Sequence, residues 1–66
     1  MTTKTIRADV INHHQLTLFE VTDLLNTKQY IIKVEKDNKV LSEQTFEALD
    51  IALAIYDGMQ VFYEKQ

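Results

Sequence analysis

The period of the hydrophobic pattern changes near Phe46, and this change constrains the fold more than any other feature. Before Phe46, apolar side chains alternate with polar ones, as in half-buried strands. After it, they recur every three or four residues, as in an amphipathic helix. The sequence therefore predicts one α+β domain over residues 1–66. We expect an antiparallel meander of three to four strands with one long C-terminal helix packed across one face.

The predicted strands differ in how cleanly they alternate. Lys4–Asn12 alternates throughout, and Ile6, Ala8 and Val10 are predicted on its buried side. The other predicted strands are Gln15–Val21, Gln29–Glu35 and Val40–Glu43. Within the second of these the alternation slips, which indicates either a bulge near Leu18–Phe19 or a strand that is buried on both sides.

The connections between the predicted strands carry typical turn residues. Asp and Asn tolerate left-handed backbone conformations, so a tight hairpin turn is expected at Asp37–Asn38. Thr22–Lys28 is predicted to be a longer connection with Asn26 as its turn residue. Leu24 and Leu25 lie inside this connection, and they are expected to be either buried under it or exposed for contact.

His13 and His14 are the only histidines, and with Gln15 they interrupt the alternation. Adjacent histidines on a strand point to opposite faces, and metal sites usually combine histidine with spaced carboxylates or cysteines. We therefore expect a solvent-exposed turn here, with no metal site. The acidic side chains near the helix start are expected to be stabilised there by the helix dipole, and we expect no acid–base chemistry from them. These are Glu43, Glu47 and Asp50.

The helix is predicted to begin at Thr45 or Phe46. Its expected packing stripe is Ala48, Ala52, Ile55, Met59 and Phe62, flanked by Leu49, Leu53, Tyr56 and Tyr63, with Asp50, Ala54, Asp57, Val61 and Glu64 solvated. Gly58 could instead end the helix and release a final strand at Met59–Glu64. A continuous helix is preferred, because Gly costs only about 1 kcal/mol inside a helix.

The apolar part of this helix is wider than one small sheet can cover. A 66-residue chain has a thin stability margin, and this one has no Cys for disulfides, so association is the expected way to bury the excess. We therefore predict a homodimer that also contacts another protein, since aromatic residues are enriched in interface cores. The predicted interface residues are Leu49, Leu53, Tyr56, Met59, Phe62 and Tyr63.

Charge is unevenly distributed along the chain, which has a net charge of −3. Residues 40–66 carry five acidic residues and a single basic one, Lys65. Nucleic-acid binding through Arg7 and Lys33 on the polar face of the sheet is the main alternative, although strongly basic patches are usual for that function. An acidic mimic of DNA is a third alternative, and its acids are too interrupted by apolar residues to favour it.

The layout of the second half resembles that of the small sheet-plus-helix DNA-binding modules of ethylene-response factors and of some phage-type integrases. In those modules a hairpin leads through a Phe into a helix with an Ala-rich stretch and a Tyr-Asp pair. The matching residues are Phe46, Ala52, Ala54, Tyr56 and Asp57. These are mostly packing residues, and the aromatic and Arg residues that those modules place on their sheets are absent. The resemblance implies a shared layout only.

Several classes of function lack a sequence signal. The absence of Cys removes thiolate catalysis and thiolate metal sites, and it is compatible with a reducing cytoplasm. No segment has the apolar length of a signal peptide or a membrane span. We therefore expect a cytoplasmic, non-enzymatic protein without a cofactor, of a kind that suits bacterial or phage accessory proteins.

Overall fold

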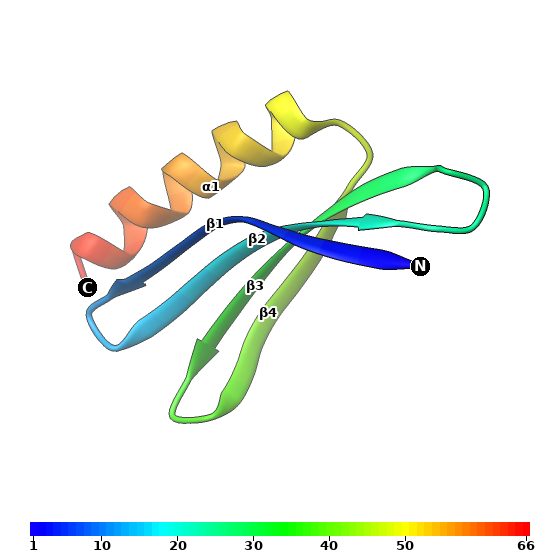
Figure 1. The fold of residues 1–66 in the computed structure, drawn as a ribbon. Coiled ribbons are helices and arrows are strands. Elements are labelled where there is room, and N and C mark those ends of the chain that lie inside the picture. Colours follow the sequence, from blue (N-terminus) through cyan, green and yellow to red (C-terminus); the bar gives the residue numbers. More distant parts are fainter.

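The sheet is a four-stranded antiparallel meander in the order β1-β2-β3-β4. The computed structural model describes all 66 residues. Its elements are β1 (Thr2–Ile11), β2 (His14–Thr22), β3 (Lys28–Lys36), β4 (Lys39–Phe46) and α1 (Leu49–Glu64). The helix crosses one face of the sheet and leaves the other face open (Figure 1). The predicted α+β fold, with one C-terminal helix across a meander, is confirmed.

Two hairpins of the meander close through two-residue turns with positive φ at both positions. The β3–β4 turn has φ values of 54° at Asp37 and 65° at Asn38. The β1–β2 turn has 48° at Asn12 and 68° at His13. Both are the type I′ conformation that matches the twist of the flanking strands. The predicted turn at Asp37–Asn38 is confirmed, whereas the first turn lies one residue earlier than predicted and His14 belongs to β2.

Of the two alternatives for the slip in Gln15–Val21, the bulge near Leu18–Phe19 is wrong. The strand β2 pairs with β3 without a shift from Gln15 to Thr22. The irregularity lies instead in β1, between Thr5 and Arg7, opposite the place where the alternation of β2 slips. A bulge adds one residue to a strand and so exchanges the faces of the residues that follow it.

This bulge overturns the predicted orientation of the first strand. Arg7 and Asp9 pair with the two buried leucines of β2 and therefore lie on the helix side of the sheet. Of the residues predicted to be buried, Ile6 packs partly against the core, whereas Ala8 is exposed and Val10 is 72% exposed on the open face. The alternation of β1 is real, but the bulge reverses which set faces the helix.

The core is small and lies between the two central strands and the helix. Its fully buried members are Leu16, Leu18, Ile32, Val34, Ala52 and Tyr56. Seven further apolar side chains pack partly against it, from β1, β3, β4 and α1. The centre of the helix packing face is therefore at Ala52 and Tyr56, rotated away from the predicted stripe through Ile55 and Phe62.

The helix is continuous through Gly58, as predicted, and no final strand forms. It begins at Leu49 rather than at Thr45 or Phe46, because β4 continues until Phe46 pairs with Tyr30. No side chain caps its N-terminus. Glycine at position 58 does not have a positive φ, so it acts as an ordinary helical residue and not as a left-handed cap.

The C-terminus of the helix is capped from the first hairpin turn. The Asn12 side-chain Nδ2 donates to the backbone oxygens of Tyr63 at 2.7 Å, Glu64 at 3.3 Å and Gln66 at 3.3 Å. The last carbonyls of a helix have no partners within the helix. The type I′ turn therefore places an amide donor where these carbonyls need one.

Candidate interaction surfaces

The structure divides the predicted interface residues between the core and the surface. Tyr56 is fully buried, and Leu53, Met59 and Tyr63 are half-buried against the core. Leu49, at 36% exposed, and Phe62, at 58%, are the two whose side chains are largely accessible. The sheet therefore covers most of the residues that were predicted to form the interface. The exposed apolar surface of the helix lies on a different side of the helix from the predicted one.

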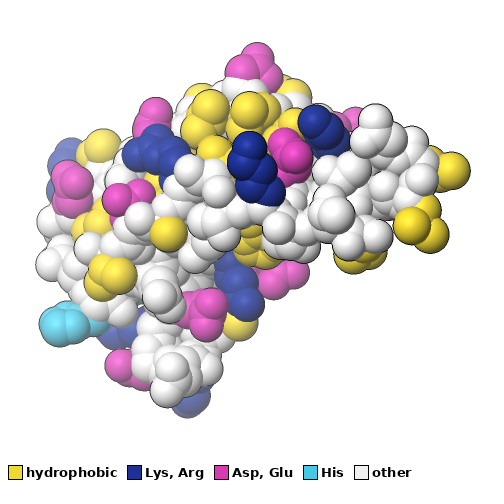
Figure 2. All heavy atoms as spheres, viewed as in Figure 1, with side chains coloured by type: hydrophobic (Ala, Val, Ile, Leu, Met, Phe, Trp, Pro, Cys, Tyr) yellow, Lys and Arg dark blue, Asp and Glu magenta, His cyan; other side chains and the backbone are white.

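The side of α1 that faces away from the sheet carries an exposed apolar surface, which we call the outer helix face. Its large members are between 40% and 58% exposed, and hydrophobic side chains are visible over the helix in Figure 2. It has two parts at helical spacing: a seam of Ile51, Ala54, Gly58 and Val61, and an apolar flank of Ile55 and Phe62.

Charge lies on the other side of the seam. Asp50, Asp57 and Glu64 are spaced seven residues apart and therefore follow one line along α1, which we call the acidic flank. All three are exposed. The helix therefore presents an apolar seam between an apolar flank and an acidic flank, and this order gives the surface a direction.

Arg7 joins the edge strand β1 to the acidic flank. Its guanidinium donates to the Asp57 carboxylate at 2.7 Å and to the Gln60 side-chain oxygen at 2.9 Å. The guanidinium also lies over the Tyr56 ring, 4.7 Å from its centroid. The hydrogen bond with Asp57 raises the pKa of Arg7 above its ordinary value. Arg7 therefore holds the helix against the sheet.

Tyr56 makes the most buried polar contact between helix and sheet. Its hydroxyl donates to the Asp9 carboxylate at 2.6 Å and also lies 3.1 Å from the Leu16 backbone oxygen. Burial and the contact with Asp9 raise the pKa of Tyr56. The neutral phenol is thus favoured, and this buried tyrosine, predicted as an interface residue, is instead a structural donor between helix and sheet.

Sequence reasoning missed this polar cluster because its members are far apart in the chain. The Tyr56–Asp9 and Arg7–Gln60 contacts join residues 47 and 53 positions apart. The sequence held one signal of it. The first strand carries two charged residues, Arg7 and Asp9, and the helix that packs on the sheet carries Asp57. The bulge at Ile6 hid that signal, since the uninterrupted alternation assigned both charges to the wrong face.

The β2–β3 connection displays two leucines at its tip. Leu24 is 91% exposed and Leu25 is 86% exposed. The turn is held by the Asp23 carboxylate, which accepts hydrogen bonds from the backbone N–H groups of Leu25 and Thr27, both at 2.9 Å. Asn26 has a φ of 64°, which makes it the turn residue predicted from the sequence.

This tip reaches beyond the rest of the sheet, and Figure 2 shows its hydrophobic side chains at the far end of the molecule. Of the two sequence-based alternatives for the leucines, burial under the connection is wrong, because both are exposed. A turn with four internal hydrogen bonds holds its shape without help from the leucine side chains. The tip is therefore a second apolar surface, separate from the helix.

The open face of the sheet carries mixed chemistry. Its central residues, Phe19 and Ile31, pair across β2 and β3 and are half-buried. Lys33 lies on this face, 3.5 Å from Glu35, whereas Arg7 lies on the helix side. The two residues of the nucleic-acid alternative are thus on opposite faces of the sheet and do not form one basic patch.

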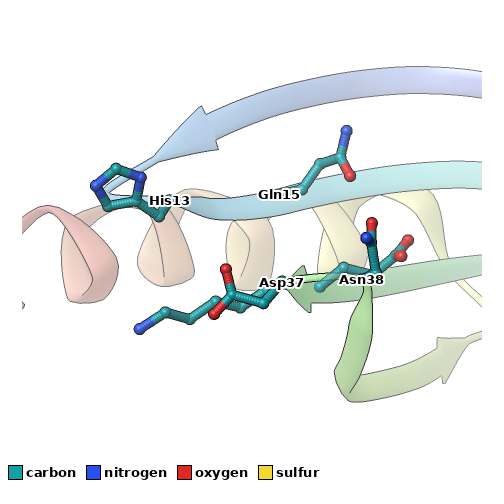
Figure 3. A pocket seen from close by; sticks show the side chains of 6 residues that line it. His13, Gln15, Asp37 and Asn38 are labelled. Atoms are coloured by element: carbon teal, nitrogen blue, oxygen red, sulfur yellow. The ribbon is translucent and has the colours of Figure 1, made fainter.

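A shallow polar hollow of about 140 Å³ lies between the β1–β2 and β3–β4 turns. It is lined by His13, Gln15, Glu35, Lys36, Asp37 and Asn38. In Figure 3 the labelled side chains point in different directions and do not converge. No group of three or more His, Asp or Glu side chains in the structure is placed to hold a metal ion.

The two histidines separate, contrary to the predicted exposed turn for both. His13 is exposed in the turn, whereas His14 is only 8% exposed at the start of β2. The His14 ring packs on Tyr63 with centroids 4.4 Å apart, and its Nδ1 lies 2.9 Å from the Asn12 backbone oxygen. Because a carbonyl can only accept, Nδ1 carries the proton in this contact.

Comparison of the chain with protein-family models, curated proteins and solved structures finds no match. The single helix of the structure does not have the combination of length and apolar character that crossing a membrane requires.

Proposed function

We propose that this protein is a small, non-catalytic interaction module that acts by contact, as an accessory, adaptor or inhibitor protein. The observation that supports this most directly is the outer helix face. Ile51, Ile55, Val61 and Phe62 are all exposed on the side of the helix that the sheet does not use. Contiguous apolar patches rimmed by polar residues are typical of protein–protein contact sites.

Burial of this face supplies the driving force. Removing apolar surface from water contributes roughly 25 cal/mol per Å². The core of the monomer holds only six fully buried apolar residues, so contact through a second apolar surface adds substantially to its stability. We propose that one partner at this face is a second copy of the chain, forming a homodimer.

The hairpin tip is the proposed contact for another protein. Leu24 and Leu25 are too far exposed to contribute to the fold, and their turn is ordered by Asp23 before any partner binds. A pre-ordered apolar tip loses little conformational entropy on binding. If the protein dimerises through its helix, this tip stays free to bind another protein that has an apolar cleft.

No catalytic role is proposed for the polar groups. The side chain with the largest shift in pKa, Tyr56, is fully buried and committed to Asp9. The polar hollow is shallow and its side chains do not converge (Figure 3). The reducing cytoplasm is the proposed compartment, since a chain without Cys depends on no disulfide.

Nucleic-acid binding through the open sheet face stays the alternative. Lys33 is the basic residue that this face offers at its centre, and it already lies close to Glu35. Titration with duplex DNA and with RNA at two salt concentrations tests it. Binding that weakens steeply with salt would support the alternative.

Mass measurement over a range of concentrations tests the leading proposal. Analytical ultracentrifugation should show reversible self-association of the unaltered protein. Ile55→Lys should abolish this association while the circular dichroism spectrum is retained. Val10→Lys is the matched control, because it also replaces an exposed apolar residue, but on the open sheet face. A monomer at every concentration, or equal loss with both variants, would contradict self-association through the helix.

A further inference from the structure

We propose that the outer helix face pairs with the same face of a second copy in antiparallel orientation. The twofold axis would pass between the two helices at the level of residue 56, midway between Ala54 and Gly58. This inference rests on the proposed function and adds to it the orientation and register of the contact. It is carried by the symmetry of the seam about the middle of the helix, by the charges at the two ends of α1, and by the pairing of the apolar flanks.

The small residues of the seam lie symmetrically about the middle of the helix. Because α1 runs from Leu49 to Glu64, its midpoint falls between residues 56 and 57. Ala54 and Gly58 lie on either side of this midpoint, on the outer face. In an antiparallel pair with the axis there, Ala54 of one copy faces Gly58 of the other.

The large members of the seam match across the same axis. Ile51 of one copy lies level with Val61 of the other, so each large side chain meets another of similar size. Interhelical distances of 8–10 Å depend on the side chains at the contact. Small residues at the crossing allow the shorter distances, and nothing within 4 Å fills the space next to the Gly58 Cα.

The charges at the two ends of the helix favour the antiparallel orientation. Glu47 and Asp50 are exposed near its N-terminal end, and Lys65 follows its C-terminal end. An antiparallel pair brings Lys65 of each copy beside the acidic residues of the other. It also places opposite ends of the two helix dipoles together. A parallel pair would set Glu47 against Glu47 and Lys65 against Lys65 at the two ends of the helix.

The two flanks of the seam favour the same orientation. A twofold axis between antiparallel helices places each flank beside the same flank of the partner helix. The apolar flank of one copy therefore lies along the apolar flank of the other, and Ile55 faces Ile55 near the axis. In a parallel pair, this apolar flank would lie beside the acidic flank. The same symmetry places the two acidic flanks side by side, which opposes the contact. At Asp57, the acid closest to the axis, this repulsion is reduced because Arg7 pairs with it at 2.7 Å.

The size of the contact predicts a reversible dimer. A helix of 16 residues is about 24 Å long, and one face of it buries less than the ~800 Å² per partner of a standard stable interface. We therefore expect monomer and dimer to exchange at ordinary protein concentrations. This makes the effect of single substitutions measurable.

Disulfide formation tests the register. The chain has no Cys, so introduced ones report without background. Ile51→Cys and Val61→Cys chains should form a mixed disulfide when combined, and each alone should cross-link slowly. Residues ten positions apart are about 15 Å apart along a helix, beyond the reach of a disulfide. Fast cross-linking of each variant alone, with little mixed product, would show a parallel pair and overturn the inference.

A charge exchange tests the orientation independently. Lys65→Glu should weaken dimerisation by about three- to tenfold, because it puts an added acid beside Glu47 and Asp50 of the partner copy. Glu47→Lys should do the same, and the double variant should return to the affinity of the unaltered protein. In a parallel pair the double variant would gain nothing over the single ones. Glu43→Gln, on β4, is the control for a charge change remote from the helix.

The outcomes separate this inference from the proposed function. If Ile55→Lys abolishes association but the cross-linking and charge-exchange patterns fail, the helix face remains the contact and the antiparallel register is wrong. If the unaltered protein is a monomer throughout, both the register and the proposed self-association are overturned. If association persists in Ile55→Lys, the contact lies elsewhere and the register is again overturned.

Discussion

Tyr56 donates its hydroxyl proton to the Asp9 carboxylate at 2.6 Å and so ties the middle of the helix to the edge strand β1. The contact lies on the helix side of the sheet, next to the core leucines. A bulge in β1 turns Asp9 inward, and without that turn the phenol would be buried with only the Leu16 carbonyl to accept its proton. The packing of the helix therefore depends on an irregularity in a strand.

Removing the hydroxyl of Tyr56 should destabilise the protein measurably. Tyr56→Phe leaves the ring in place but leaves Asp9 without its donor, and we expect a loss of about 1–2 kcal/mol in the free energy of unfolding. Urea unfolding at pH 7 measures it. Asp9→Ala combined with Tyr56→Phe should cost less than the sum of the two single changes. Full additivity would show that the two groups do not interact.

High pH should destabilise the fold through the same tyrosine. Burial, and then the contact with Asp9, raise the pKa of Tyr56 above its ordinary value of about 10. A group with a raised folded pKa contributes stability below its unfolded pKa and loses it as the pH rises through the folded pKa. Unfolding stability should therefore fall above about pH 10.

The Tyr56→Phe variant isolates this effect from other titrating groups. Its unfolding free energy should fall less steeply between pH 9 and pH 12 than that of the unaltered protein. Parallel curves for the two proteins would show that Tyr56 does not carry the pH dependence.

Substitutions at position 12 should show that the helix C-terminus is stabilised by a hydrogen-bond donor there. Asn12→Gly retains the positive φ of the turn but loses the amide donor, and should cost about 0.5–1 kcal/mol. Asn12→Asp should cost more, because a carboxylate would face the carbonyl oxygens of Tyr63 and Glu64. Thermal unfolding measures both.

The second hairpin provides the control for that comparison. Asp37 occupies the same position in the other type I′ turn but does not contact the helix end. Asp37→Gly should therefore have a smaller effect than Asn12→Gly. Equal costs at the two positions would attribute the loss to the turn and not to the cap.

The elements with strong local signals were predictable from the sequence. The change of period at Phe46, the turn at Asp37–Asn38 and the continuous helix through Gly58 each depend on neighbouring residues. The face of β1 was not predictable in this way. Its bulge depends on pairing with β2, and the residues that it turns inward find their partners on a helix about 50 positions later.

The exposed surface was predictable in kind but not in position. The helix carries more apolar residues than the sheet can cover, and this excess was visible in the sequence. Which residues form the excess depends on the rotation of the helix about its axis. The contacts of Tyr56 with Asp9 and of Asp57 with Arg7 fit a rotation that leaves Ile55 outside. Helical periodicity does not reveal such contacts with a distant strand, so it cannot predict this rotation.

Replacing Gly58 by Ala should stabilise the monomer. An added Cβ meets nothing within 4 Å, so Gly58→Ala should raise the free energy of unfolding of the dilute monomer by about 0.5–1 kcal/mol. Ala54→Gly is the matched control, and it should lower that free energy by a similar amount. A loss of stability in Gly58→Ala would contradict the helical conformation at this position.

A larger side chain at the same position tests the crossing of the two helices. Gly58→Gln keeps good helix propensity but places a long side chain where Ala54 of the second copy would lie. The monomer should remain at least as stable as the unaltered protein, whereas the dimer should dissociate at concentrations where the unaltered protein is associated. Sedimentation at several concentrations measures this, with Glu64→Gln as the control on the acidic flank. Undiminished association of Gly58→Gln would show that the helices do not cross at this glycine.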